Sequence, residues 1–521
     1  NPPTLNGAVS RIMRLLLTSF TETPHVCRTV QRFYSSPEIF APKSSVNSFC
    51  LRTHHCGQLR LENVGERVEL YGWLAQKRLG KFLVLRDSYG RVQATVPDDK
   101  LDEFRQLLSD LRKESVVKVT GIVSDRGKDR NKGMPTGDIE VLIEEMEMLN
   151  TCVDSSPVAR HRGQEGSPEM NRMTYRYMDL RTEQMQYNLR MRSQIQSQIR
   201  RFLESVNFVE VETPTLSQIT PGGAAEFIVP APKPNLGLCF SLPQSPQIYK
   251  QLLMCGGIDR YYQFARCYRD ERLNPERQSE FTQVDIELSF TDQESVISLI
   301  ENMILESWPQ QLGDYKPTVP FNRMTYAKSM EKYGTDKPDL RKSPKEENDF
   351  QFVWIVNFPL FTFKSGAIES THHPFTAPIH EHLDDLINSR NLKDITALHY
   401  DLVLNGVELG GGSIRIHDSK LQRHVLENIL RIDSEPMKRF SSALEHGAPP
   451  HGGFALGFDR YISTILGSKC PSIRDCIAFP KTATNRCLTM GAPNSPTPEI
   501  YQRYGLQPSK EQTTDEKSSR N

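Results

Sequence analysis

The chain has 521 residues, of which 37% are hydrophobic and 25% are charged, and it carries 64 basic and 64 acidic side chains. This length predicts at least two domains, because a single hydrophobic core rarely grows to this size. No apolar run approaches the ~20 residues that a membrane-spanning helix needs, so we expect no membrane partner. The balanced charge leaves nucleic-acid binding open, since a local basic stripe is sufficient to contact phosphates.

The ten cysteines are scattered along the chain without a C-x-x-C pair. This spacing predicts neither a zinc ribbon nor a dense disulfide framework. Reduced thiols in a matrix or cytosolic compartment are the simplest interpretation.

Residues 1–45 differ in composition from the rest of the chain. Arginines are spread among Ser, Thr and the apolar patch Ile12–Leu17, whereas acidic residues are few. This composition is typical of a mitochondrial transit peptide, with an ordinary disordered tail as the alternative. The arginines are Arg11, Arg14, Arg28 and Arg32.

Residues 52–150 are predicted to form five short strands with one helix, Leu101–Leu111, between the third and the fourth strand. Turn residues such as Gly90 separate the strands. Five strands in this arrangement favour an OB-fold β-barrel, although another small β-barrel has the same periodicity. The predicted strands are 68–73, 82–87, 92–96, 116–123 and 139–143.

Residues 151–172 are rich in Ser, Pro and Gly and form a predicted linker. Residues 173–507 then form a predicted second domain that begins with an amphipathic helix, Arg181–Val206. Its apolar face is expected to hold Leu189, Ile195 and Ile199. A short strand ending at Pro214 follows this helix.

The remainder of the second domain is predicted to be a sheet with helices. Tyr261–Tyr268 and Glu280–Phe290 form a predicted antiparallel pair, because no helix separates them. Strands are expected near Trp354 and Asp401, followed by a Gly-rich strand–helix unit. The polar tail, 508–521, is predicted to be disordered.

Two long segments of this domain carry a family resemblance. Phe264–Asp285 contains FARCYRDE and EFTQVD, and Gly452–Arg460 reads GGFALGFDR. They resemble motifs 2 and 3 of the class II aminoacyl-tRNA synthetases, in particular the bacterial and mitochondrial aspartyl enzymes, and the unit ending at Pro214 resembles motif 1. From Arg52 to about Gln507, the resemblance implies a multidomain protein. Its parts would be an OB-fold anticodon-binding domain, an α+β catalytic domain built on an antiparallel sheet, and a homodimer interface.

The resemblance assigns ATP to motifs 2 and 3. Arg269 and Arg460 are the expected catalytic residues, because a guanidinium binds phosphate oxygens bidentately and stabilises their charge. On a single arginine, a surface ion pair would be the ordinary interpretation. The residues expected to bind ATP are Arg269, Asp270, Glu271, Gln278, Glu408, Gly457, Phe458, Asp459 and Arg460.

Two carboxylates, Asp401 and Glu408, are expected to hold Mg²⁺ together with ATP oxygens. On spacing alone, two solvated acids that flank the Asn405–Gly406 turn would be the preferred interpretation. Gly410–Arg415, which follows them, resembles the synthetase segment whose arginine contacts the amino-acid side chain, and this favours the metal site.

The amino-acid substrate is predicted from charge. Aspartate needs a cation for its side-chain carboxylate and an anion for its ammonium group. Arg415 and Lys250 are the candidate cations, and Asp285 is the candidate for the ammonium group. The segment Gln244–Lys250 resembles the Q-S-P-Q-x-x-K of the aspartyl family. His372 and His373 are adjacent and resemble a loop that closes on the amino acid. No third ligand with metal-like spacing accompanies these two histidines, so we expect no zinc. The expected aspartate-binding residues are Ser245, Gln247, Lys250, Arg269, Asp285, His372, His373 and Arg415.

The chain departs from the bacterial pattern at two places. Gly222 stands where bacterial members carry a glutamate in the loop over the amino acid, and Glu226 is a conceivable substitute. Only about a dozen residues join Gly334–Asp339 to the strand at Trp354, too few for the insertion domain of the relatives. This domain is therefore missing near 341–352, through loss in the lineage or a skipped exon.

In the predicted barrel, Arg78, Phe82 and Gln93 match positions that contact the anticodon in the family, since OB folds bind unpaired bases by stacking and polar edge contacts. A core role is the alternative for Phe82. The resemblance implies an ATP-dependent ligase that forms aspartyl-adenylate and charges tRNA-Asp in the mitochondrial matrix, with the cytoplasm as the alternative. An asparaginyl or lysyl enzyme and a non-catalytic paralogue are the rival hypotheses.

Overall fold

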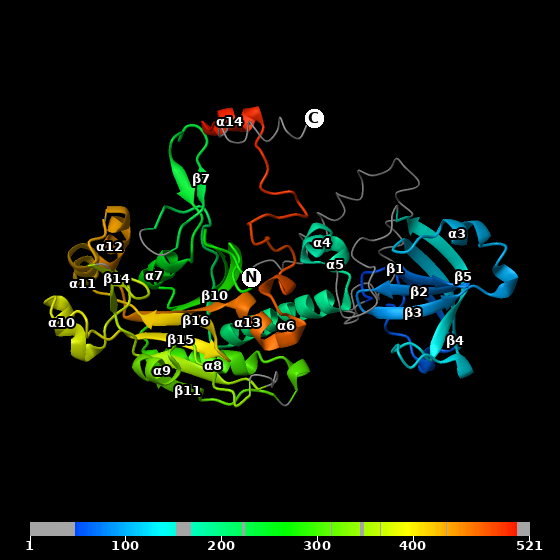
Figure 1. Ribbon diagram of the computed structural model, residues 1–521, viewed down its shortest axis with the longest axis horizontal. Helices are drawn as coiled ribbons and strands as arrows, with labels where there is room; N and C mark the ends of the chain where they lie inside the picture. The colour runs from blue at the N-terminus through cyan, green and yellow to red at the C-terminus, as the bar shows by residue number, and fades with distance from the viewer. Residues whose placement is uncertain are drawn as a thin grey trace, which may run out of the picture. The chain divides into compact units, whose positions relative to one another are not determined.

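The computed structural model describes residues 47–152, 168–220, 224–313, 315–343, 349–364, 366–433 and 435–507 (Figure 1). The chain divides into two compact units between residues 155 and 156. The predicted leader 1–45, the tail 508–521 and Gly222 lie outside the described residues. Among those residues, no helix has the length and apolar character needed to cross a membrane.

The first unit is a closed five-stranded barrel with strand order β1-β2-β3-β5-β4. Buried and exposed side chains alternate along its strands, so that Leu70, Leu83, Leu85 and Val119 fill the interior. The prediction of five strands with a helix after the third is confirmed. Its elements are β1 (Arg67–Arg78), β2 (Phe82–Asp87), β3 (Gly90–Thr95), α3 (Arg105–Asp110), β4 (Val116–Asp125) and β5 (Ile139–Asn150).

The second unit is built on an eight-stranded sheet with the order β11-β12-β15-β16-β17-β10-β9-β6. The two outer pairs, β11–β12 and β6–β9, are parallel, and the inner pairs are antiparallel. The predicted antiparallel pair is therefore confirmed as β9 and β10. The strands are β6 (Val209–Glu210), β9 (Arg260–Tyr268), β10 (Glu280–Ser289), β11 (Asn322–Thr325), β12 (Phe352–Val356), β15 (His399–Leu404), β16 (Val407–Ile414) and β17 (His451–Gly457).

Helices and two small hairpins complete the second unit. One hairpin pairs β7 (Ile228–Pro230) with β8 (Cys239–Ser241), and the other pairs β13 (Phe361–Lys364) with β14 (Ala367–Ser370). The helices are α4 (Glu169–Thr174), α5 (Arg176–Asp179), α6 (Glu183–Ser205), α7 (Gln247–Cys255), α8 (Gln293–Glu306), α9 (Tyr326–Tyr333), α10 (Leu383–Ile387), α11 (Ser419–Arg423), α12 (Lys438–Glu445), α13 (Phe458–Leu466) and α14 (Pro498–Tyr504).

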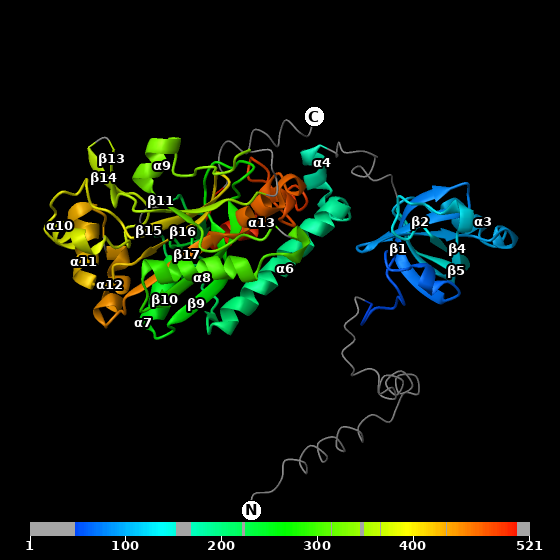
Figure 2. The same cartoon turned by 90° about the horizontal axis from the view of Figure 1, so that it is seen from below.

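The large sheet has one apolar face and one polar face, because successive side chains of a strand point to opposite sides. On β10, Val284 and Ile286 join the core under α6, α8 and α13 (Figure 2). Asp285 and Glu287 therefore lie on the opposite face, where they are completely enclosed. The same alternation on β15 directs Tyr400 into the core and Asp401 away from it.

The first long helix, α6, begins after Thr182, whose side chain accepts a hydrogen bond from Met185 N. Ile195 and Ile199 are buried as expected, but Leu189 is only partly buried. The neighbouring Asn188 takes the buried position and donates to the carbonyls of Lys469 and Asp475. The predicted face was wrong at Leu189 because hydrophobicity alone could not reveal these carbonyl partners.

Candidate functional site

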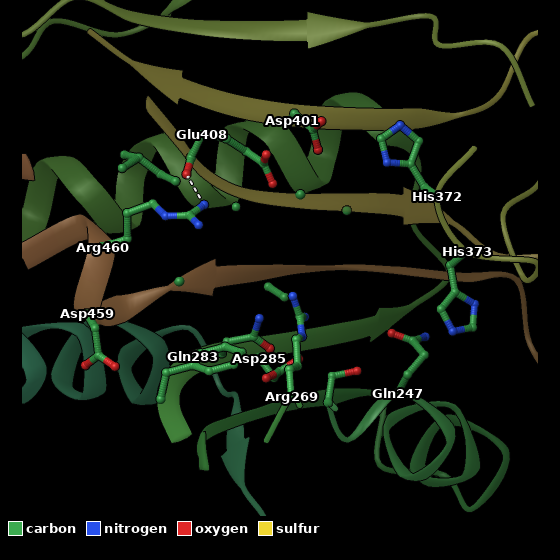
Figure 3. A pocket seen from close by; sticks show the side chains of 18 of the residues that line it. Gln247, Arg269, Gln283, Asp285, His372, His373, Asp401, Glu408, Asp459 and Arg460 are labelled. Atoms are coloured by element: carbon green, nitrogen blue, oxygen red, sulfur yellow. Dashed lines mark hydrogen bonds between the residues drawn. The ribbon is translucent and has the colours of Figure 1, made fainter. Parts of the chain in front are cut away.

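A cavity of about 360 Å³ opens on the polar face of the large sheet (Figure 3). Its walls come from α7, the β9–β10 hairpin, β15, β16 and the start of α13. The cavity brings together fifteen of the predicted substrate and metal residues, which are far apart in the sequence. These fifteen are Ser245, Gln247, Lys250, Arg269, Glu271, Gln278, Asp285, His372, His373, Asp401, Glu408, Arg415, Gly457, Asp459 and Arg460.

Lys250 and Arg415, the predicted cations for the amino acid, lie on either side of Glu287. Lys250 Nζ is 3.2 Å from Glu287 Oε2, and Arg415 Nε is 3.0 Å from Glu287 Oε1. Burial works to raise the pKa of Glu287, but Arg415 and Lys250 outweigh it and lower the pKa to about 2. Glu287 therefore remains charged and holds both cations at a fixed separation.

Asp285, the predicted ligand of the ammonium group, has one oxygen in use and one available. Its Oδ1 lies 3.2 Å from Lys250 Nζ, whereas the enclosed Oδ2 has no hydrogen-bond partner within the described chain. Burial raises the pKa of this carboxyl group, although Lys250 opposes the shift. An enclosed acceptor without a partner is costly, so this oxygen is suited to an ammonium ligand.

Arg269 directs its guanidinium into the same cavity. The group lies over the Phe281 ring, 5.1 Å from its centroid, and in the described residues Nε has no hydrogen-bond partner. On the facing wall, Arg460 donates from Nη1 to the Glu408 carbonyl at 2.8 Å. The two arginines thus approach the cavity from separate walls, as two phosphate contacts require.

Two residues of the predicted ATP set do not line the cavity. Phe458 is wholly buried, with its ring edge-on to Phe264 at 5.2 Å, so the prediction of a direct ligand is wrong for its side chain. Asp270 is exposed, and its backbone N–H donates to the Ala225 carbonyl. Asp459 does line the cavity, but its carboxylate accepts from Thr282 N at 2.9 Å and pairs with Arg192.

Gln278 and Glu271 reach the cavity with their polar groups already engaged. The Gln278 amide accepts from Lys481 N at 2.7 Å and donates to the Lys481 carbonyl at 3.2 Å. Glu271 lies 3.3 Å from Arg277. Glu226, the conceivable substitute for the missing glutamate, accepts from Ser241 and Gln244. It therefore supports its own loop and does not line the cavity.

The histidine pair divides between two regions of the cavity. His373 lies beside Gln247, whereas His372 lies beside Asp401 (Figure 3). Burial, reinforced by Arg415, lowers the pKa of His373 to about 3. Burial and His399 lower the pKa of His372 to about 4. Both rings are therefore neutral at pH 7.

Asp401 and Glu408 supply carboxylate oxygens, which are ligands that Mg²⁺ prefers. Both face the cavity, and a Cβ at Gly411 would lie 2.2 Å from Asp401 Oδ1, so glycine is required beside this carboxylate. Burial and Glu408 raise the pKa of Asp401 to about 8. Glu408 lies 2.7 Å from Lys337 Nζ, a competing cation that the sequence did not reveal.

On the barrel, strand register brings the three predicted anticodon residues onto one face. Arg78 pairs with Phe82, and Val84 pairs with Gln93. Phe82 is partly exposed and lies outside the barrel core, which contradicts the alternative of a core role. Gln93 donates to Glu140 at 2.9 Å, a partner 47 residues away that sequence reasoning missed.

An OB barrel joined to an antiparallel sheet with two arginines facing a carboxylate-lined cavity defines a class II aminoacyl-tRNA synthetase. Residues 168–483 match the family of class II tRNA synthetases (D, K and N), and residues 68–149 match the OB-fold nucleic acid binding domain. The asparaginyl-tRNA synthetase of Pyrococcus horikoshii, solved with asparaginyl-adenylate, superposes with a TM-score of 0.66 at 20% identity. This match covers 83% of this chain and 99% of that one.

Two curated relatives identify the family to which the chain belongs within this class. The mitochondrial aspartate–tRNA ligase of Homo sapiens is 38% identical, with 91% of this chain and 93% of the relative covered. An aspartate–tRNA(Asp/Asn) ligase of Thermosynechococcus vestitus is 35% identical, with 90% and 99% covered. The chain belongs to the aspartate–tRNA ligase family. The human alignment extends over 613 positions, more than the 521 residues of this chain, so the relative has residues that this chain lacks.

Proposed function

We propose that this protein activates L-aspartate with ATP to give aspartyl-adenylate and pyrophosphate, and then transfers the aspartyl group to the 3′ end of tRNA-Asp. The observation that carries the proposal is the enclosed set of Lys250, Arg415 and Asp285. Two cations and one acceptor without a partner match the charges of aspartate in a cavity that also holds Arg269 and Arg460.

In the first step, the α-carboxylate of aspartate attacks the α-phosphate of ATP. Arg269 would bind the α-phosphate and the substrate carboxylate, and Arg460 would bind the γ-phosphate. Asp401 and Glu408 would hold Mg²⁺, which supplies positive charge to the phosphate oxygens when it is bound. The residues act by positioning and charge stabilisation, and no covalent enzyme intermediate is needed.

His373 and Gln247, which lie side by side, are proposed to close the aspartate end of the cavity with Ser245. On the barrel, Phe82 would stack on an anticodon base while Gln93 and Arg78 contact its edge and a phosphate. The partial exposure of Phe82 on the face shared with Gln93 supports this arrangement.

A homodimer and a mitochondrial location complete the proposal. Apolar side chains stay exposed on the edge strand β6 and on the hairpin β7–β8, with exposed fractions of 47% for Val209, 48% for Ile228 and 65% for Leu238. Such a surface is suited to a partner subunit. The names of the mitochondrial relatives and the basic leader support the matrix as the location.

Amino-acid-dependent pyrophosphate exchange tests the proposal. We expect exchange with aspartate, and none with asparagine or lysine, because the two cations of the cavity require a carboxylate. Transfer is then measured with tRNA-Asp and tRNA-Asn. Exchange with asparagine or lysine instead of aspartate would favour the rival enzymes, and absence of exchange with every amino acid would favour a non-catalytic paralogue.

We also propose that the shortened connection between α9 and β12 leaves aspartate activation intact. The catalytic residues lie outside residues 341–352, and β11 still pairs with β12. Grafting an insertion domain into this connection should change tRNA affinity or stability with little change in pyrophosphate exchange. Loss of all aminoacylation in the natural form, with recovery on grafting, would contradict this.

A further inference from the structure

His399 lies at the start of β15, two residues before Asp401. Residues separated by two positions on a strand share a face, so both side chains point to the cavity. His399 Nε2 is 2.8 Å from Asp401 Oδ1. The His372 ring stacks on His399 with 3.4 Å between the ring centroids. Two imidazoles and one carboxylate thus converge at one place.

The geometry of this cluster is compatible with one metal ion. One ligand atom from each of the three residues lies within 4.8 Å of the other two. Two ligands that bind one zinc ion at ~2.1 Å are about 3.4 Å apart at the tetrahedral angle. Small rotations of His372 and Asp401 would therefore bring the three atoms into a single coordination shell.

The donor set differs from that of a magnesium site. Mg²⁺ prefers oxygen ligands, whereas imidazole suits Zn²⁺, Co²⁺ and similar ions. Three protein ligands with a fourth side open to a cavity are the usual arrangement of an accessible zinc site.

The surroundings of the cluster hold its ligands in place. The Phe358 ring lies edge-on to His372 at 4.7 Å and to His399 at 5.1 Å. Phe358 itself is 1% exposed, so it forms a rigid apolar support for both imidazoles. Gly411 leaves room on the other side, since a Cβ there would also lie 3.5 Å from His399 Cε1.

We propose that His372, His399 and Asp401 bind one borderline transition-metal ion, such as Zn²⁺ or Co²⁺, in the protein without nucleotide. Sequence spacing predicted no zinc because no third ligand was evident, and the fold supplies His399 as that ligand. Since Asp401 is also proposed to hold Mg²⁺ with ATP, the bound ion inhibits aspartate activation. This second statement rests on the proposed function, whereas the binding itself does not.

Binding is tested on the full-length protein without nucleotide, by cobalt titration followed by absorption and by equilibrium dialysis. We expect one ion per chain with the intense visible bands of a four-coordinate site. His399→Ala and His372→Ala should each weaken binding at least ~10-fold. His446→Ala is the matched control, because His446 is exposed and its ring is bonded to the Ser442 carbonyl at the end of α12. Equal affinity in all four proteins would overturn the proposal.

Three further measurements keep the test decisive. Thermal unfolding shows whether His399→Ala is folded, and if it is not, His372→Ala carries the test because its partly exposed ring is less important for packing. Mg²⁺–ATP should weaken cobalt binding, since both need Asp401. Micromolar Zn²⁺ should inhibit pyrophosphate exchange in the unmodified protein and in His446→Ala. Cobalt binding that persists unchanged with Mg²⁺–ATP would overturn the shared role of Asp401.

Discussion

Replacing Glu287 by glutamine tests whether this side chain organises the amino-acid pocket. Glu287 contacts Lys250 and Arg415 at 3.2 and 3.0 Å and is fully buried. Glutamine keeps its shape but removes its charge. Removal of one member of a buried ion pair costs about 3–5 kcal/mol. Lys250 would keep Asp285 as a partner, so we expect the lower end of this range for the loss in unfolding free energy.

The lowered pKa of Glu287 gives a similar value for the loss in unfolding free energy. The pKa falls from an ordinary value of 4.5 to about 2. This difference of roughly 2.5 units corresponds to about 3 kcal/mol. Because the pKa is lowered in the folded state, the stabilisation is fully present above pH 4.5 and is lost as the pH falls towards 2. The Glu287→Gln variant and the unmodified protein should therefore converge in stability in acid.

Urea unfolding followed by tryptophan fluorescence measures this difference. In a Trp73→Phe background, the signal comes from Trp308 and Trp354, which both belong to the second unit. Glu445→Gln is the control, because its pair with Arg423 is half exposed and should contribute less than about 1 kcal/mol. A Glu287→Gln variant as stable as the control at pH 7, or a loss that does not change between pH 7 and pH 3, would refute the reasoning.

Three further predictions concern the nucleotide and tRNA sites. Gly411→Ala would place a Cβ 2.2 Å from Asp401 Oδ1. Because this contact displaces the proposed metal ligand, pyrophosphate exchange should fall about 100-fold. Unchanged exchange would contradict the contact. Phe82→Ala should lower kcat/KM for tRNA about 10- to 100-fold, since one stacked base contributes about 1–3 kcal/mol. Exchange without tRNA should not change, and an equal loss in both assays would contradict stacking. Lys337→Ala removes the partner of Glu408, so the Mg²⁺ concentration for half-maximal exchange should fall about two- to fivefold. An increase would indicate that Lys337 assists nucleotide binding.

The sequence was sufficient to predict the elements whose signals are local. Alternation and turn residues identified the five barrel strands, and the spacing of polar and apolar residues identified β9 and β10. The motif resemblance singled out Arg269 and Arg460, and the structure places both on the walls of one cavity. The strand predictions succeeded because each rests on residues that are neighbours in the chain.

Residues whose role depends on strand register could not be predicted in the same way. Glu287 and His399 each lie two positions from a predicted residue, so the alternation of a strand offered a signal that was not used. Lys337 and Glu140 gave no such signal, because their partners Glu408 and Gln93 are brought to them only by the fold. The Phe458 side chain lies in the core, and a motif position does not distinguish a ligand from the core residue that supports it.

The shortened connection between α9 and β12 can affect the catalytic cavity through one residue, Lys337. β11 forms the outer edge of the sheet and keeps its parallel pairing with β12, so the strands that carry Asp285, Asp401 and Glu408 do not depend on the length of the connection. Lys337 is different, because it belongs to the segment before the connection and contacts Glu408 at 2.7 Å. A change in this connection can therefore reach the cavity by moving Lys337, and Mg²⁺ dependence is the property in which such a change would first be measured.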